Sequence, residues 1–275
     1  MKQIKIAHEA PKCIFEKVQN LTDYDYALVH LFEKDPEYFS LFKTALLNGR
    51  EVILDNSVFE LEKAFDPERF LYWIKLLKPT YYIVPDVLED ALGTINNMAN
   101  WVNDYIWRVP SGCKMIGVVQ GKDFKEICMC YRHMVNIARV DKVAISFDYS
   151  YYEQSFPHPN KLISWAFGRA KLLGDLEKEG ILRKDIPHHL LGCGTPGEGI
   201  LYETPEFEYI DSMDTSNPVV HGYRGFRYRG PLGMIFKVPT KLCTLMDSEI
   251  EPERWDTIEY NINEFKRLWG GNYGI

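Results

Sequence analysis

The sequence predicts a single (β/α)8 barrel, and three observations support this fold. The chain has 275 residues, close to the roughly 250 over which such a barrel forms one domain. Eight short runs of β-forming residues alternate with longer segments of helical period. The runs are apolar on consecutive residues, which is typical of parallel strands covered on both faces. Together these features favour one closed parallel barrel spanning residues 1–275.

The eight β-rich runs contain many aromatic and β-branched residues. They are Lys5–Ala10, Tyr26–Phe32, Glu51–Ser57, Tyr81–Val87, Met115–Gly121, Val143–Phe147, His189–Gly194 and Tyr209–Thr215. An open doubly wound sheet shares the alternation of strands and helices. That architecture is less favoured, because no GxGxxG follows the first run and no GxxxxGK[ST] occurs in the chain.

The segments between the runs have caps and apolar stripes at helical spacing. Asp66 followed by Pro67 predicts an N-cap with proline at the first helical position. A last amphipathic helix at about 252–269, with Pro252 near its start, closes the predicted ring. The apolar stripes are Phe70, Ile74 and Leu77; Leu92, Ile95, Ala99 and Val102; Phe124, Ile127, Tyr131 and Met134; Ile163, Ala166, Phe167, Ala170 and Leu173; and Trp255, Ile258, Ile262 and Phe265.

Composition predicts a soluble cytoplasmic protein. Hydrophobic residues make up 46% and charged residues 26% of the chain, the balance of an ordinary globular protein. No run reaches the roughly 18 apolar residues of a membrane span, and the first residues do not resemble a secretory leader. The six cysteines are expected to be reduced thiols. A zinc site at Cys128, Cys130 and His133 is the less favoured alternative, because a zinc site needs about four convergent ligands.

The charge is distributed unevenly along the chain. The net charge is -7, yet the segment Thr215–Met246 contains no Asp or Glu and carries five positive charges. The rest of the chain therefore carries -12. Local positive charge of this kind is the footprint of a phosphate-binding surface, so we expect a nucleic-acid partner. The alternative is a solvated loop with ordinary charges. The five residues are Arg224, Arg227, Arg229, Lys237 and Lys241.

Polar residues gather where the predicted strands end. In a barrel the active site lies at the C-terminal ends of the strands, and the residues there are Asp55, Asp86, Gln120, Asp211 and Asp214. Taken singly, such an Asp is often the N-cap of the next helix. Asp90 is a better cap candidate than Asp86. Asp211 and Asp214 lie three apart and would face opposite ways in a strand, so one of them is expected to be structural.

These residue types suit glycosidic chemistry on a planar base. Two carboxylates at one pocket can attack an anomeric carbon and handle the proton of the leaving group. Gln120 offers both a donor and an acceptor to the edge of a base. Phe59 could stack on a planar ring, or could equally be a core residue.

The motifs LDNSVFE, VPDVLED, GVVQG, HLLGCGTP and YIDSMDTSNP occur in this order. As an ordered set over about residues 5–230, they resemble the tRNA-guanine transglycosylase family. The LDN and PDVLED forms are most similar to the phage and bacterial DNA 7-deazaguanine transglycosylases. The resemblance implies a (β/α)8 enzyme that exchanges guanine in a polynucleotide for a 7-deazaguanine base such as 7-cyano-7-deazaguanine, with no cofactor.

The resemblance also implies roles for individual residues. Asp214 would be the nucleophile and Asp55 the general acid/base, while Asp86 and Gln120 would hydrogen-bond the guanine edge. Phe59 matches the aromatic residue that sandwiches the base, and Ser146 lies where the family presents main-chain groups. Because a duplex must flip its guanine out, we expect the basic segment to hold the backbone through Arg224, Arg227 and Arg229, with Tyr223, Phe226 and Tyr228 available for stacking.

The sequence departs from the family at two points. Ser57 and Val58 replace two glycines of the family motif, and the Cys3His zinc site of the tRNA enzymes has no counterpart after Lys237. Both DNA and tRNA therefore stay open as substrates, with DNA favoured. Two alternatives also stay open: a barrel nucleosidase or glycosidase that uses water, and a non-catalytic subunit that only binds nucleic acid. The sequence does not predict the oligomeric state.

Overall fold

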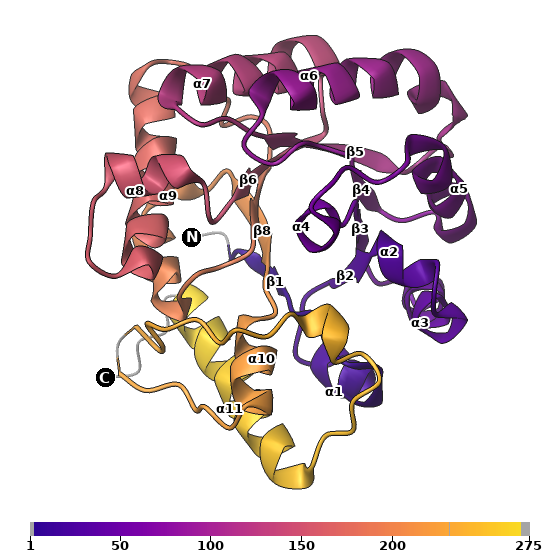
Figure 1. Cartoon of the computed structure of the whole chain (residues 1–275), viewed down its shortest axis with the longest axis vertical. Helices are drawn as coiled ribbons and strands as arrows, with labels where there is room; N and C mark the ends of the chain where they lie inside the picture. The colour runs from indigo at the N-terminus through magenta and orange to yellow at the C-terminus, as the bar shows by residue number, and fades with distance from the viewer. Residues whose placement is uncertain (1–2, 231, 271–275) are drawn as a thin grey trace. The chain divides into compact units, whose positions relative to one another are not determined.

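The computed structural model describes residues 3–230 and 232–270, and its strands form one eight-stranded sheet (Figure 1). Every predicted run overlaps one of these strands, and four strands begin one residue before the predicted run. They are β1 (Lys5–Ala7), β2 (Asp25–Leu28), β3 (Val52–Asp55), β4 (Tyr81–Ile83), β5 (Lys114–Val119), β6 (Lys142–Ser146), β7 (His188–Leu191) and β8 (Ile210–Asp214).

The strand order identifies the fold class. Neighbours in the sheet run β1-β8-β7-β6-β5-β4-β3-β2, so the order from β2 to β8 and on to β1 is the order of the chain around a ring. The registered pairs, from β1 with β8 to β5 with β6, are parallel. Parallel neighbours need crossover connections, and helices provide them. The predicted (β/α)8 class is confirmed.

Eleven α-helices occur in the described residues. Asp66 and Asp90 accept hydrogen bonds from the first turns of α5 and α6, as predicted, and the expected closing helix is α11. The helices are α1 (Phe15–Gln19), α2 (Val29–Phe32), α3 (Pro36–Leu47), α4 (Val58–Leu61), α5 (Pro67–Leu77), α6 (Ala91–Asn100), α7 (Phe124–Arg132), α8 (Ser150–Ser155), α9 (Lys161–Lys178), α10 (Asn217–Tyr223) and α11 (Pro252–Trp269).

The predicted strands extended too far at their C-terminal ends. The run Tyr26–Phe32 is a strand only to Leu28, and Val29–Phe32 forms α2. The ring of Phe32 packs against those of Phe39 and Trp73, so aromatic packing holds this turn as a helix. A short apolar run has no periodicity that separates strand from helix, which explains the error.

The chain falls into two compact units. The first contains Met1–Asp23, Phe147–Asp175 and His189–Ile275, and the second contains Tyr24–Ser146 and Leu176–His188. In the first unit α10 packs on α11, in which Ile258, Ile262 and Phe265 of the predicted stripe are buried. In the second unit α6 packs on α7, and the apolar face of α5 is buried. That the chain is one domain stays a prediction.

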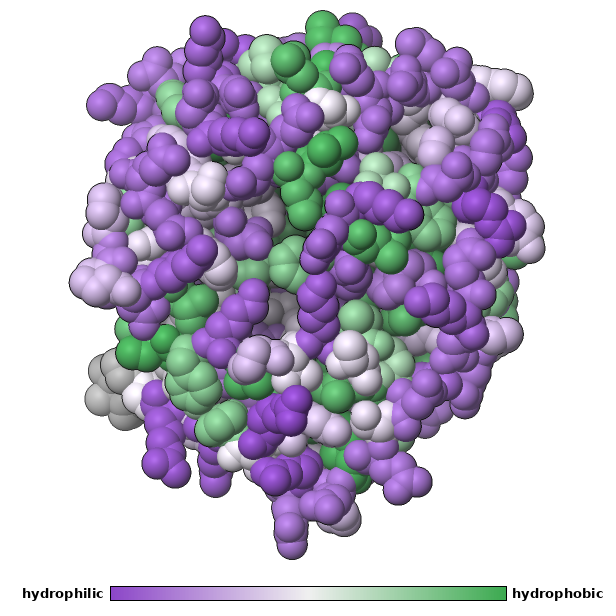
Figure 2. Space-filling view, viewed as in Figure 1, coloured by the Kyte–Doolittle hydropathy of each residue, from purple (hydrophilic) through white to green (hydrophobic). Residues whose placement is uncertain are grey.

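The face shown in Figure 2 is mostly hydrophilic, as expected for a chain with the composition of a globular protein. Hydrophilic side chains predominate there, with smaller hydrophobic areas between them. All six cysteines are free thiols. In the part of the chain that the structure describes, no helix combines the length and the apolar character needed to cross a membrane.

Candidate active site

The candidate residues lie where the strands end. Asp55, Ser146 and Asp214 are the last residues of β3, β6 and β8, and Gln120 directly follows β5. Asp86 lies three residues beyond the end of β4. The first unit carries Asp214 and the basic segment, whereas the second carries the other four and Phe59.

In the second unit Asp86 is the centre of a buried hydrogen-bonded cluster. Asp86 and Gln120 are only 2% and 1% exposed, and the Gln120 amide Nε2 donates to Asp86 Oδ2 at 2.6 Å. Asn56 Nδ2 donates to Asp86 Oδ1 at 2.8 Å. The Glu89 N–H donates to Gln120 Oε1 at 2.9 Å. The structure therefore brings together the two residues predicted to read the base edge.

The cluster keeps hydrogen-bonding capacity for a ligand. Each oxygen of Asp86 accepts one bond from these amides, whereas a carboxylate has about four acceptor positions, and Gln120 has a second amide hydrogen. Burial raises the pKa of Asp86, and the bonds from Asn56 and Gln120 oppose that rise. Asp86 does not cap the next helix, because Asp90 does so.

Asp55 is held at both carboxylate oxygens. The Tyr26 hydroxyl donates to Oδ1 at 2.9 Å, and the Ser57 N–H donates to Oδ2 at 2.6 Å. The second contact fixes the turn between β3 and α4, so Asp55 has a structural role in addition to any chemical one. Phe59 lies in α4 and is 40% exposed. The alternative interpretation of Phe59, a core residue, is therefore wrong.

In the first unit the two oxygens of Asp214 have different environments. Oδ1 is 3.0 Å from His189 Nε2 and 3.4 Å from the donating Gly192 N–H. His189 Nδ1 is in turn 2.9 Å from the Ser212 hydroxyl. No described residue hydrogen-bonds Oδ2, although Asp214 is only 5% exposed. One oxygen is thus anchored, and the other keeps all its lone pairs. Asp211 is half-buried on the same strand.

The loop that supplies the Gly192 N–H is fixed by a buried ion pair. Arg169 donates to the carbonyls of Leu191 and Gly192, at 3.0 Å each, and its Nε donates to Glu198 at 2.7 Å. The Tyr202 hydroxyl also donates to Glu198. Burial raises the pKa of Glu198, and the Arg169 charge opposes that rise. Gly192 has φ +65°, and a Cβ there would lie 2.4 Å from the Phe147 ring, so glycine is required.

Sequence reasoning missed His189, Arg169 and Glu198. For Arg169 a signal existed, because it lies on the same helical face as Ala166 and Leu173 in the predicted stripe. A charge on an apolar face indicates a buried partner. His189 carried no comparable signal, because a histidine in an apolar strand run is compatible with many contacts.

The basic segment exposes its three arginines. Arg224 Nε donates to the Thr240 hydroxyl at 3.0 Å, and the Arg227 guanidinium lies 3.6 Å from the centre of the Tyr260 ring. In the described structure the side chain of Arg229 makes no hydrogen bond or ion pair. The three side chains are accessible, as a phosphate-binding role requires.

One of the three aromatic residues expected to stack on bases is unavailable. Tyr228 is buried, and its hydroxyl bonds Asn217 while its N–H donates to Asn261. That expectation is wrong for Tyr228, because its ring is part of the core of the first unit. Phe226 is exposed and packs edge-to-face on Phe236, with ring centres 5.1 Å apart.

The cysteines expected to be structural are buried. Cys128 and Cys130 lie in α7, and burial raises the pKa of Cys130 to about 12. Within residues 3–230 and 232–270, no three potential ligands converge in a metal-binding arrangement.

Comparison with models of known protein families gives no match, and comparison with curated proteins gives none either.

Proposed function

We propose that this protein is a guanine transglycosylase that exchanges guanine in a polynucleotide, with DNA favoured, for a 7-deazaguanine base such as 7-cyano-7-deazaguanine. One observation carries the proposal: Asp214 has one anchored oxygen and one that no described residue hydrogen-bonds. This arrangement suits a nucleophilic carboxylate, since the anchored oxygen orients the group while the other is available to attack. The position of Asp214 at the end of β8 and the ordered motifs support the same role.

In the first half-reaction, Asp214 Oδ2 forms a bond to the anomeric carbon of the target nucleotide as the bond from that carbon to guanine breaks. The electron pair of the breaking bond leaves with guanine. Asp55, in its acid form, gives a proton to the departing base. The product is a glycosyl ester of Asp214.

In the second half-reaction, Asp55 is a carboxylate and takes the proton from the glycosidic nitrogen of the incoming base. That nitrogen attacks the anomeric carbon, and the ester bond breaks to restore the Asp214 carboxylate. Atoms and charges balance over the cycle, so the reaction needs no oxidant, reductant or further co-reactant.

Base recognition is assigned to the second unit. Asp86 and Gln120 form one buried hydrogen-bonding cluster, Phe59 offers an exposed ring, and Ser146 ends β6. A base in a duplex must be flipped out at a cost of a few kcal/mol. Contacts of Arg224, Arg227 and Arg229 with the backbone offset that cost.

The nucleophile is tested with Asp214→Asn and a matched control, Asp211→Asn, three residues earlier on the same strand. Asp214→Asn should abolish base exchange and any denaturant-resistant adduct between protein and guanine-containing DNA or tRNA. Asp211→Asn should retain both. Denaturing gels and mass spectrometry of the nucleosides measure the two outcomes. Exchange at the wild-type rate in Asp214→Asn would remove Asp214 from the mechanism.

Asp55→Asn should slow turnover but still allow some adduct, because proton transfer assists the step whereas the nucleophile is indispensable. The same assays separate the remaining alternatives. Net release of guanine without incorporation of the supplied base indicates a nucleosidase that uses water. Binding without an adduct or release indicates a non-catalytic subunit. If the supplied base is incorporated only into tRNA, then tRNA and not DNA is the substrate.

A further inference from the structure

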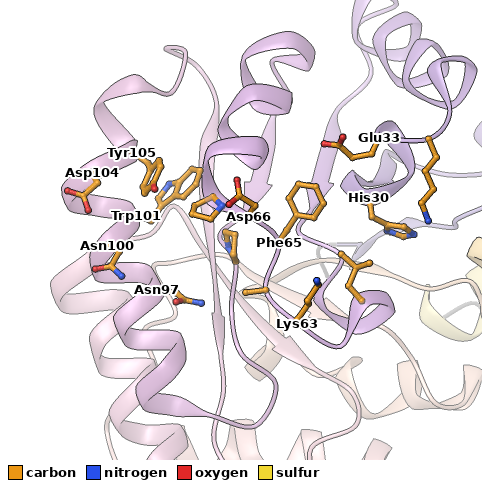
Figure 3. Close-up of a pocket in the computed structure, with 15 residues that line it drawn as sticks. His30, Glu33, Lys63, Phe65, Asp66, Asn97, Asn100, Trp101, Asp104 and Tyr105 are labelled. Carbon is orange, nitrogen blue, oxygen red and sulfur yellow. The ribbon is translucent and has the colours of Figure 1, made fainter.

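A pocket of about 830 Å³ opens in the second unit, apart from the candidate catalytic residues (Figure 3). Its walls come from α2 and the residues just after it, the end of α4 and its connection to α5, helix α6 and the π-helical turn Trp101–Tyr105. Its volume lies within the roughly 300–1,000 Å³ of small-molecule sites. None of its lining residues is a predicted catalytic or base-binding residue.

Three polar side chains of the lining have no partner in the described structure. The side chains of Asn97, Asn100 and Lys63 make no hydrogen bond or ion pair there. In Figure 3, Asn97 and Lys63 point towards the middle of the pocket. Two amides and an ammonium group thus offer both donors and acceptors to an occupant.

His30 adds a buried polar group. Its side chain is 7% exposed, and Nδ1 has no hydrogen-bond partner. Burial lowers the pKa of His30 to about 4, with a smaller contribution from the charge of Lys34, so the ring is neutral near pH 7. A neutral imidazole has one donor and one acceptor nitrogen, which suits an uncharged, hydrogen-bonding ligand.

The charges of the lining balance. Glu33 is already bound by Arg69 and the Trp73 indole. The remaining charges are the cations Lys34 and Lys63 and the anions Asp66 and Asp104. An occupant with a large net charge of either sign would therefore gain little from this pocket.

Aromatic rings give the pocket flat apolar walls. Phe65 is half-buried, and Tyr105 stacks on the fully buried Trp101 with the ring centres 5.2 Å apart. Phe65 and Tyr105 both line the pocket, and such rings stack well on another planar ring.

We infer that this pocket is a binding site for a nucleobase, in a free nucleoside or in a polynucleotide. A nucleobase is planar and uncharged, and its edge carries donors and acceptors side by side, which matches the aromatic walls, the balanced charge and the free amides. The pocket borders the turn that holds Asp55: the His30 N–H donates to the Ser57 hydroxyl, and the Ser57 N–H donates to Asp55. The inference goes beyond the proposed base exchange and does not depend on it.

Equilibrium dialysis of the full chain with guanosine, adenosine, cytidine and thymidine tests the site. Asn97→Ala should weaken binding of the preferred nucleoside about fivefold to tenfold, the loss expected for one hydrogen bond. Asn96→Ala is the matched control, because Asn96 is exposed on the same helix and does not line the pocket. Alanine favours a helix, so both variants should fold.

The same measurement on Asp86→Asn separates the pocket from the candidate active site. Binding that survives in Asp86→Asn and weakens in Asn97→Ala supports the pocket, even if no base exchange is ever found. A short single-stranded oligonucleotide that binds with the same Asn97 dependence, while free nucleosides do not, identifies a base within a polynucleotide as the occupant. Absence of any binding, unchanged binding in Asn97→Ala, or displacement of the nucleoside by glucose would overturn the inference.

Discussion

Replacing Arg169 with methionine should destabilise the protein by about 3–5 kcal/mol, the cost of removing one partner of a buried ion pair. The structure supports a value in this range because Glu198 would be left buried without its counter-charge. The carbonyls of Leu191 and Gly192 would each lose a donor as well. The loss is a large part of the 5–15 kcal/mol of a typical domain, yet small enough to leave a folded protein to measure.

The loss should depend on pH in a defined direction. Burial raises the pKa of Glu198 in the folded state even with Arg169 present, and removing the guanidinium raises it further. A carboxyl group with a raised folded pKa costs stability as the pH increases above its unfolded value of about 4.3. The difference between wild type and Arg169→Met should therefore be larger at pH 8 than at pH 5, as measured by urea unfolding.

Two further variants make the test decisive. Arg169→Met combined with Glu198→Leu should recover part of the stability, since no buried charge remains. Arg183→Met removes an arginine from an exposed pair with Asp185 and should leave unfolding nearly unchanged. If Arg169→Met costs less than about 1 kcal/mol, or the double variant is no more stable than the single, the ion pair does not fix this loop.

Three other expectations follow. Ser57→Gly should be more stable than Ser57→Ala by about 1 kcal/mol in urea unfolding, because both lose the hydroxyl but only glycine accepts φ +60° without strain; equal stability would argue against strain. Replacing Arg224, Arg227 and Arg229 with alanine should weaken nucleic-acid binding and reduce the logarithmic salt slope by up to about three units, whereas an unchanged slope would leave a plain surface loop. Burial is the main cause that lowers the pKa of His8 to about 4 in the folded protein. Below about pH 6.5 the unfolded chain therefore binds more protons at His8 than the folded protein does, and the free energy of unfolding decreases as the pH is lowered. His8→Asn should reduce the stability lost between pH 7 and pH 4 by roughly 3 kcal/mol, and an unchanged loss would mean that other groups cause it.

The fold was predictable because each level of the sequence agrees with it. The pair Asp66 and Pro67 predicted the start of α5 correctly. The apolar stripe after Pro252 predicted both ends of α11.

The stripe predicted for α6 was wrong, because Leu92 is 62% exposed and the buried face of that helix carries Ala91, Thr94 and Met98. The end of the second predicted strand was wrong as well. The segment Val29–Phe32 is buried on every residue and has no sequence period of its own, and it is the packing of Phe32 against the Trp73 ring that supports a helix there.

The candidate site was predictable in position but not in detail. The fold class directed attention to the strand ends, and Asp55, Asp86 and Asp214 do lie at or just beyond the ends of strands. The partners of these residues come from segments distant in sequence, such as Gln120 for Asp86 and His189 for Asp214. Such pairing depends on strand register, which one sequence does not reveal. The burial of Tyr228 was missed for the same reason, because its neighbours Asn217 and Asn261 become adjacent only on folding.

Ser57 has a backbone conformation that both serine and glycine can adopt. The backbone there has φ +60°, in the left-handed region that glycine adopts most easily. Serine keeps this backbone, and its hydroxyl accepts a hydrogen bond from the His30 N–H, which contributes about 0.5–1.5 kcal/mol against a strain of about 1–2 kcal/mol. Val58 begins α4 as an ordinary buried helical residue. The turn that orients Asp55 is therefore compatible with serine as well as with glycine.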